Sequence, residues 1–153
     1  YMFTLGKSVG VSGAIVVASN EIVDYLIQKA KTYIYTTALS PAFASGIITS
    51  LNIIKKGKDS RVKLLELINI LRKKIKNKML LGNSITPIQP ILINDTKQSM
   101  QLSEKLLEKG FYVPVIRPPT VPRNTSRLRI SISALHTPKD IKKLAELINL
   151  NVK

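Results

Sequence analysis

The spacing of apolar residues predicts helices through most of the first half of the chain. The apolar run 13–18 predicts a short buried strand, and a helix is expected to follow over 20–32. Ser40 can cap a second helix, with Pro41 at its first position and Gly57 at its end. A third helix, over 59–78, is expected to bury an apolar stripe that consists of Leu64, Leu65, Ile68, Leu71 and Ile75.

In the second half the pattern changes to an alternation of strands and helices. Strands are expected over 88–93 and 111–116, separated by a helix that is capped near Asp95 and ends at Gly110. A last helix opens at Thr137, and its inward residues are expected to be Ile141, Leu144, Ala145 and Ile148.

The strand expected over 126–134 has the clearest alternation in the chain. Its two faces carry Leu128, Ile130, Ile132 and Ala134 on one side and Arg127, Arg129, Ser131 and Ser133 on the other. The order of elements predicts a small α+β unit over 58–153 with a short, mainly antiparallel sheet, preceded by a separate first part, 1–57.

The composition excludes several classes of protein. Hydrophobic residues make up 44% of the 153 residues, which is enough for a packed core. No apolar run approaches the ~20 residues that span a bilayer, so no membrane partner is expected. The absence of cysteine excludes thiolate metal sites and fits a reducing cytoplasm. His136 is the only histidine and precedes a helix cap, where a structural role is more common, so no metal is expected.

The formal net charge is +15, from 24 basic and 9 acidic residues. A charge of this size suggests nucleic acid as a partner. Most lysines are nevertheless spread along amphipathic helices, as in 72–78, and aromatic residues do not interleave with them as a single-strand platform requires. A solvated helix surface is therefore favoured, and no nucleic acid is expected as a partner. A non-enzymatic basic module that binds nucleic acid is the alternative from another functional class.

Lys7 is the residue that most strongly suggests chemistry. It lies in Thr4-Leu5-Gly6-Lys7-Ser8-Val9-Gly10-Val11-Ser12-Gly13, just before the first apolar run. Glycines let a backbone approach a ligand closely, and hydroxyl or N–H donors hold anionic groups, so this lysine suits a covalent cofactor anchor. A nucleotide-binding P-loop is rejected, because Tyr1 stands where its first glycine belongs and no helix follows directly. A glycine-rich turn with an exposed lysine is the competing interpretation.

Arginine is concentrated in one stretch of the second half. Four of the six arginines fall there, namely Arg117, Arg123, Arg127 and Arg129. Arginine holds a carboxylate with two parallel hydrogen bonds, so the face with Arg127 and Arg129 suits a carboxylate site, although a solvated sheet face also explains it. The segment Arg117-Pro118-Pro119-Thr120-Val121-Pro122 is stiffened by its prolines, as a binding wall or as a rigid connector.

Together these segments resemble the C-terminal part of a pyridoxal-phosphate (PLP) enzyme of the α-oxoamine synthase family, over nearly the whole chain. Residues 4–14 are similar to the family's Schiff-base segment, Tyr35-Thr36-Thr37-Ala38-Leu39-Ser40-Pro41 to its subunit-crossing loop, and 88–91 to a strand of its small domain. Its C-terminal signature is matched by residues 117–122, 127–130 and 134–136. The resemblance implies the α/β fold type I of PLP-dependent transferases. Residues 1–57 would then end the large PLP-binding domain, with a connecting helix, and 58–153 would form the small C-terminal α+β domain.

The resemblance also implies roles for individual residues. Lys7 would form the Schiff base with PLP, and the Thr4 hydroxyl would bind the cofactor phosphate. Thr36 and Thr37 would reach the phosphate of the neighbouring subunit, which implies a homodimer. Arg129 would hold the carboxylate of the amino-acid substrate, and Thr120 would contact the substrate.

Within the family, the arginine before the double proline favours the enzyme of biotin biosynthesis. That acyltransferase condenses L-alanine with a pimeloyl thioester, either pimeloyl-CoA or pimeloyl-ACP, and releases carbon dioxide; a glycine C-acetyltransferase is the alternative. The family's aspartate and histidines around the PLP ring have no counterpart here. Because Lys7 is so close to the first residue, a large part of the enzyme is expected to lie outside this sequence, and the 153 residues alone are expected to be inactive.

Overall fold

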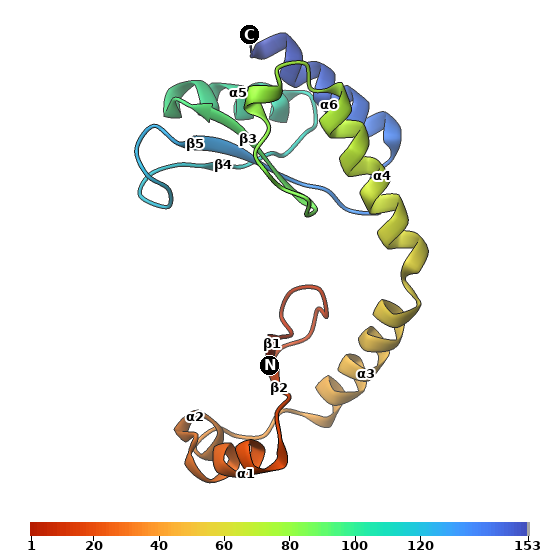
Figure 1. Cartoon of the computed structure of the whole chain (residues 1–153), viewed down its shortest axis with the longest axis vertical. Helices are drawn as coiled ribbons and strands as arrows, with labels where there is room; N and C mark the ends of the chain where they lie inside the picture. Colours follow the sequence, from red (N-terminus) through yellow and green to blue (C-terminus); the bar gives the residue numbers. More distant parts are fainter. Residues whose placement is uncertain (153) are drawn as a thin grey trace. The chain divides into compact units, whose positions relative to one another are not determined.

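The computed structural model describes residues 1–152 and divides into two compact units, of which the first is Tyr1–Lys58 (Figure 1). In this unit β1 (Met2–Thr4) pairs antiparallel with β2 (Ala14–Val16). Three helices follow, α1 (Asn20–Lys29), α2 (Lys31–Ile34) and α3 (Pro41–Lys56). The Ser40 hydroxyl accepts a hydrogen bond from the Ala42 N–H (3.3 Å), and Gly57 follows the last turn, so both predicted ends of α3 are confirmed.

Two expectations for the first unit are wrong. The single helix over 20–32 is divided at Ala30, whose extended backbone (φ −74°, ψ 101°) separates α1 from α2. The strand within 13–18 is not buried, because β2 pairs only with β1 in a two-stranded sheet. Leu5 is the only buried apolar side chain among the described residues of this unit, which therefore has almost no core of its own.

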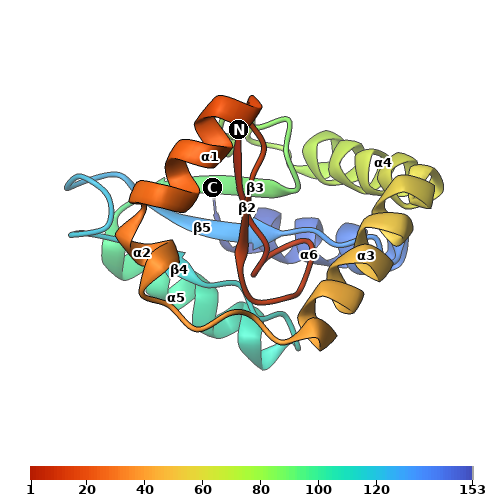
Figure 2. The ribbon, with the colours of Figure 1, turned by 90° about the horizontal axis from the view of Figure 1, so that it is seen from below.

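The second unit begins at Asp59 and contains a three-stranded antiparallel sheet with helices on one face (Figure 1). The strand order is β3-β5-β4, and β5 runs between its two neighbours (Figure 2). The strands are β3 (Ile88–Asn94), β4 (Val115–Ile116) and β5 (Ser126–Ser131). The helices are α4 (Lys58–Lys74), whose first residue still belongs to the first unit, α5 (Thr96–Glu108) and α6 (Pro138–Asn151), with a short 3-10 helix, η1 (Lys78–Leu80).

The core of the second unit lies between this sheet and the helices. The alternation predicted for β5 is confirmed, because Leu128 and Ile130 are buried while Arg129 and Ser131 are exposed. All four residues predicted to face inward from α6 are also buried. The stripe of α4 is partly wrong: Leu65 is 56% exposed, and Leu67 takes its place in the core.

Three elements of the second unit are shorter than the pattern suggested. The strand expected over 126–134 ends at Ser131, so β5 lacks the last three predicted residues. β4 contains only Val115 and Ile116, because Pro114 has no N–H to donate and the Val113 carbonyl accepts the Ser103 hydroxyl (2.6 Å). α4 ends at Lys74, and the amine of Lys78 folds back to donate to the carbonyls of Arg72 (2.6 Å), Lys73 (3.1 Å) and Ile75 (2.6 Å). Within residues 1–152 no helix combines the length and apolarity needed to cross a membrane.

Candidate cofactor and substrate site

Lys7 lies in the turn that joins β1 to β2. Two backbone hydrogen bonds close this turn, from Leu5 N–H to the Gly13 carbonyl (2.9 Å) and from Val11 N–H to the Leu5 carbonyl (3.1 Å). The buried Leu5 side chain anchors its base. At the tip, the Gly10 N–H donates to the carbonyl of Lys7 (3.0 Å), and Gly10 has the left-handed backbone (φ +71°) that favours glycine. The turn is therefore ordered by its backbone, while the Lys7 side chain stays exposed.

The polar groups of this turn are available to a ligand. The Lys7 amine makes no hydrogen bond or ion pair with the described residues, and neither do the hydroxyls of Thr4 and Ser8. The backbone N–H groups of 6–9 also have no partner among them. A Cβ added at Gly6 would meet no atom within 4 Å, so the backbone is open to close approach. A free amine beside several free donors fits a cofactor that has an aldehyde and a phosphate group, as PLP has.

The segment 35–41 contacts this hairpin through Leu39. A Cβ at Gly13 would lie 2.9 Å from Cδ1 of Leu39, and Gly13 has φ +121°, so only glycine suits this position. The Thr36 hydroxyl donates to the Thr32 carbonyl (2.5 Å), whereas the Thr37 hydroxyl has no partner among the described residues. The two threonines thus lie on an exposed segment of the same unit as Lys7.

In the second unit the two arginines of β5 differ in their contacts. The Nε of Arg127 donates to the Thr125 carbonyl (2.9 Å), which holds that side chain along its own strand. The exposed Arg129 guanidinium makes no hydrogen bond or ion pair with the described residues. Arg129 therefore keeps all of its guanidinium donors available for a carboxylate among the described residues, whereas Arg127 has its Nε engaged.

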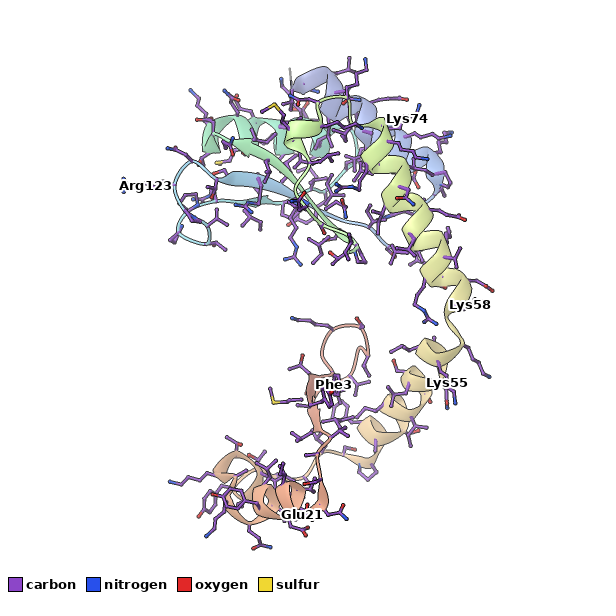
Figure 3. All side chains as sticks on the ribbon, viewed as in Figure 1. Phe3, Glu21, Lys55, Lys58, Lys74 and Arg123 are labelled. Atoms are coloured by element: carbon purple, nitrogen blue, oxygen red, sulfur yellow. The ribbon has the colours of Figure 1, made fainter. Side chains whose placement is uncertain are left out.

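Thr120 lies in the loop between β4 and β5, the loop that also carries Arg123 (Figure 3). Its backbone N–H donates to the Arg117 carbonyl (3.0 Å), which closes a turn around the cis peptide bond between Pro118 and Pro119. The Thr120 hydroxyl is exposed and makes no hydrogen bond to the described residues. Thr120 and Arg129 thus share the second unit, while Thr4, Lys7, Thr36 and Thr37 lie in the first.

His136 has a structural contact. Its Nδ1 accepts the Ser133 N–H (3.0 Å) in the turn that precedes α6. At the start of that helix Thr137 and Asp140 form a reciprocal capping box. The hydroxyl and N–H of Thr137 donate to the Asp140 carboxylate (2.7 and 2.9 Å) and hold its pKa below the ordinary value. No cluster of metal-ligating side chains is found within 1–152.

One polar network was not anticipated from the sequence. The Gln89 side chain is fully buried, and its Oε1 accepts a hydrogen bond from Arg72 (2.9 Å). Its Nε2 donates to the carbonyls of Ser84 (3.0 Å) and Thr86 (2.6 Å). The sequence does place a glutamine at an inward position of an apolar strand, which indicates a buried polar side chain. No spacing rule, however, identifies Arg72 as its partner.

The chain belongs to the aminotransferase class I and II family, whose model matches residues 1–148. Its fold is the fold type I of PLP-dependent transferases, as predicted.

Individual members of the family show how similar the chain is in sequence and in structure. The chain is 44% identical over 150 residues to the 8-amino-7-oxononanoate synthase of Aromatoleum aromaticum, covering 97% of this chain. It spans 39% of the length of that relative. The crystal structure of 8-amino-7-oxononanoate synthase from Francisella tularensis matches 99% of this chain and 44% of its own, with a TM-score of 0.85 and 32% identity. A structure of SPT with PLP as an internal aldimine matches 98% of this chain and 38% of its own, with a TM-score of 0.86 and 28% identity.

Proposed function

We propose that this chain carries the cofactor lysine and the carboxylate-binding arginine of an 8-amino-7-oxononanoate synthase. The observation that carries the proposal is the 44% identity, over 97% of the chain, to a relative of that name. The free amine of Lys7 in a turn of free N–H donors supports it, and so does the free guanidinium of Arg129. In this proposal residues 1–57 end the large PLP-binding domain and 58–153 form the small one.

The residues of the first unit bind the cofactor. Lys7 holds PLP through its Nζ, and the Thr4 hydroxyl, together with the N–H groups of 6–9, binds the phosphate. Thr36 and Thr37 reach the phosphate in the other subunit of a homodimer. PLP, when bound, supplies an electron sink for charge that develops on the amino-acid α-carbon.

The substrates are L-alanine and a pimeloyl thioester, either pimeloyl-CoA or pimeloyl-ACP. Arg129 holds the alanine carboxylate with two parallel N–H···O bonds and so fixes which bond of the α-carbon can break. Once the substrate amine has replaced it on the cofactor, the freed Lys7 Nζ would take the α-proton as general base, and Thr120 would contact the substrate. The α-carbon displaces the thiol from the thioester carbonyl, and carbon dioxide leaves the former amino acid. The products are 8-amino-7-oxononanoate, carbon dioxide and the free thiol, which is a step of biotin biosynthesis.

The test uses the full-length polypeptide that contains these residues. PLP absorbance and release of free thiol are measured with L-alanine plus pimeloyl-CoA and with glycine plus acetyl-CoA. We expect turnover with the first pair only, and we expect Lys7→Ala to lose both the absorbance and turnover. Lys55→Ala, an exposed lysine in the last turn of α3, is the matched control and should keep both (Figure 3). Turnover only with glycine and acetyl-CoA would replace the proposal with a glycine C-acetyltransferase.

The 153-residue chain by itself is a second test. We propose that it does not turn over these substrates, because no residue in it corresponds to the family's aspartate and histidines at the PLP ring. Measurable release of thiol by the purified chain, supplied with PLP, would contradict this part of the proposal.

A further inference from the structure

Arg129 lies in the middle of a row of residues that crosses the sheet. In the ladder between β3 and β5 it is directly opposite Pro90. On its other side, the Arg129 N–H donates to the carbonyl of Pro114 (2.9 Å). The register of β4 with β5 pairs Val115 with Leu128, so one residue further Pro114 is opposite Arg129. Directly opposite side chains lie on the same face of a sheet, so a proline ring flanks the arginine on each side.

The row continues outward to Gly82. Its N–H donates to the Pro90 carbonyl (3.3 Å). A Cβ at Gly82 would lie 2.6 Å from Cγ of Pro90, closer than any side chain can approach. The Gly82 backbone therefore packs directly against the Pro90 ring, and any movement of Gly82 changes the support of that ring.

Gly82 is in turn tied to α4 by the network around Gln89. Nη1 of Arg72 donates to the Gly82 carbonyl (3.1 Å) and the Ser84 carbonyl (3.3 Å), as well as to Oε1 of Gln89. Both N–H groups of the buried Gln89 amide donate to carbonyls of the same loop, and its oxygen accepts a hydrogen bond from Arg72. A buried amide is strongly unfavourable without partners, so this network favours the loop arrangement in which all of these hydrogen bonds are made.

We propose that Gln89 and Arg72 are positioning residues for Arg129. They hold the segment from Gly82 to Pro90, and the Pro90 ring then limits the rotamers that the Arg129 side chain adopts before a carboxylate binds. An arginine that is already ordered loses less conformational freedom on binding, which favours the complex. The inference rests on the proposed function, in which Arg129 holds the carboxylate of the amino-acid substrate.

The test compares KM values for the two substrates in the full-length enzyme. Gln89→Met keeps the length of the side chain and removes its hydrogen bonds. We expect the KM for L-alanine to rise about 3- to 10-fold, the range that corresponds to ordering one rotamer-rich side chain on binding. The KM for the pimeloyl thioester and kcat should stay within about twofold, because the positioning acts only on Arg129. Gln101→Met replaces an exposed glutamine of α5 whose side chain makes no hydrogen bond to the described residues, and it should change none of these values.

Two further variants make the outcome decisive. Arg129→Ala should raise the KM for L-alanine more than Gln89→Met does. If Arg129→Ala leaves the KM for L-alanine unchanged, the proposed role of Arg129 is refuted, and the positioning role of Gln89 is refuted with it. If Arg129→Ala raises the KM for L-alanine but Gln89→Met lowers only thermal stability or kcat, Gln89 is merely structural and the inference alone is refuted. Should Gln89→Met not fold, Pro90→Ala probes the same row without breaking the network. It is expected to raise the KM for L-alanine selectively, and no change would refute the inference.

Discussion

Leu71→Ala tests how α4 packs in the second unit. Leu71 is fully buried within the core cluster, whereas Leu65, on the same helix, is 56% exposed. Truncating a fully buried leucine removes its transfer free energy and leaves a cavity, so Leu71→Ala should lower the free energy of unfolding by about 3–5 kcal/mol. Leu65→Ala should lower it by less than about 1 kcal/mol, because most of that side chain already contacts water.

The assay is urea unfolding of the 153-residue chain, followed by far-UV circular dichroism. The first unit buries only one apolar side chain among its described residues, so the cooperative transition should report the second unit. With a slope of about 1–3 kcal/mol per molar urea, Leu71→Ala should lower the midpoint by at least about 1 M. Equal shifts for the two variants, at unchanged slope, would refute the packing described for α4 and would support the stripe predicted from the sequence, which contains both leucines.

Three further predictions concern local interactions in the second unit, each read from thermal or urea unfolding. The capping hydrogen bonds lower the pKa of Asp140, so this residue should stabilise α6 above about pH 4 and lose that effect as the pH falls through its folded pKa. The difference in stability between the wild type and Asp140→Ala should then shrink. A constant difference down to about pH 2 would contradict this. Gly82→Ala should destabilise by about 1–3 kcal/mol, since its Cβ would clash with the opposite proline ring, while Asn83→Ala next to it should be close to neutral. Lys78→Met should destabilise by about 1 kcal/mol through loss of three hydrogen bonds at the end of α4, and a similar effect of Lys76→Met would show that only charge matters.

The helix starts at Ser40 and Thr137 were predictable because their determinants are local. The cap formed by Ser40 and Pro41 and the box formed by Thr137 and Asp140 act on N–H groups within three residues of themselves. The alternation around Arg129 was predictable for a similar reason, since successive side chains of any strand point to opposite faces. These patterns predicted most elements of the second unit and the exposed face that carries Arg129.

Two of the errors arose where a neighbour distant in sequence decides the outcome. Leu65 and Leu67 are both leucines of one helix, and only the position of the sheet determines which of them is buried. The strand within 13–18 can be buried only if a helix or a second sheet packs on its face. Among the described residues this strand only pairs edge to edge with β1. Apolar content predicts that a segment can be buried but does not identify what covers it.

For the candidate site, the sequence by itself determined which residues have suitable chemistry. It identified a lysine among glycines and hydroxyls, and arginines on one strand face, because these properties belong to residue types and short spacings. Only the tertiary structure distinguished Arg129, whose guanidinium is free, from Arg127, whose Nε is held by a carbonyl. Only the tertiary structure joined Arg72 to Gln89, across 17 residues. The physical reason is that hydrogen-bond satisfaction and side-chain packing depend on which distant groups approach one another, and short spacings do not encode that approach.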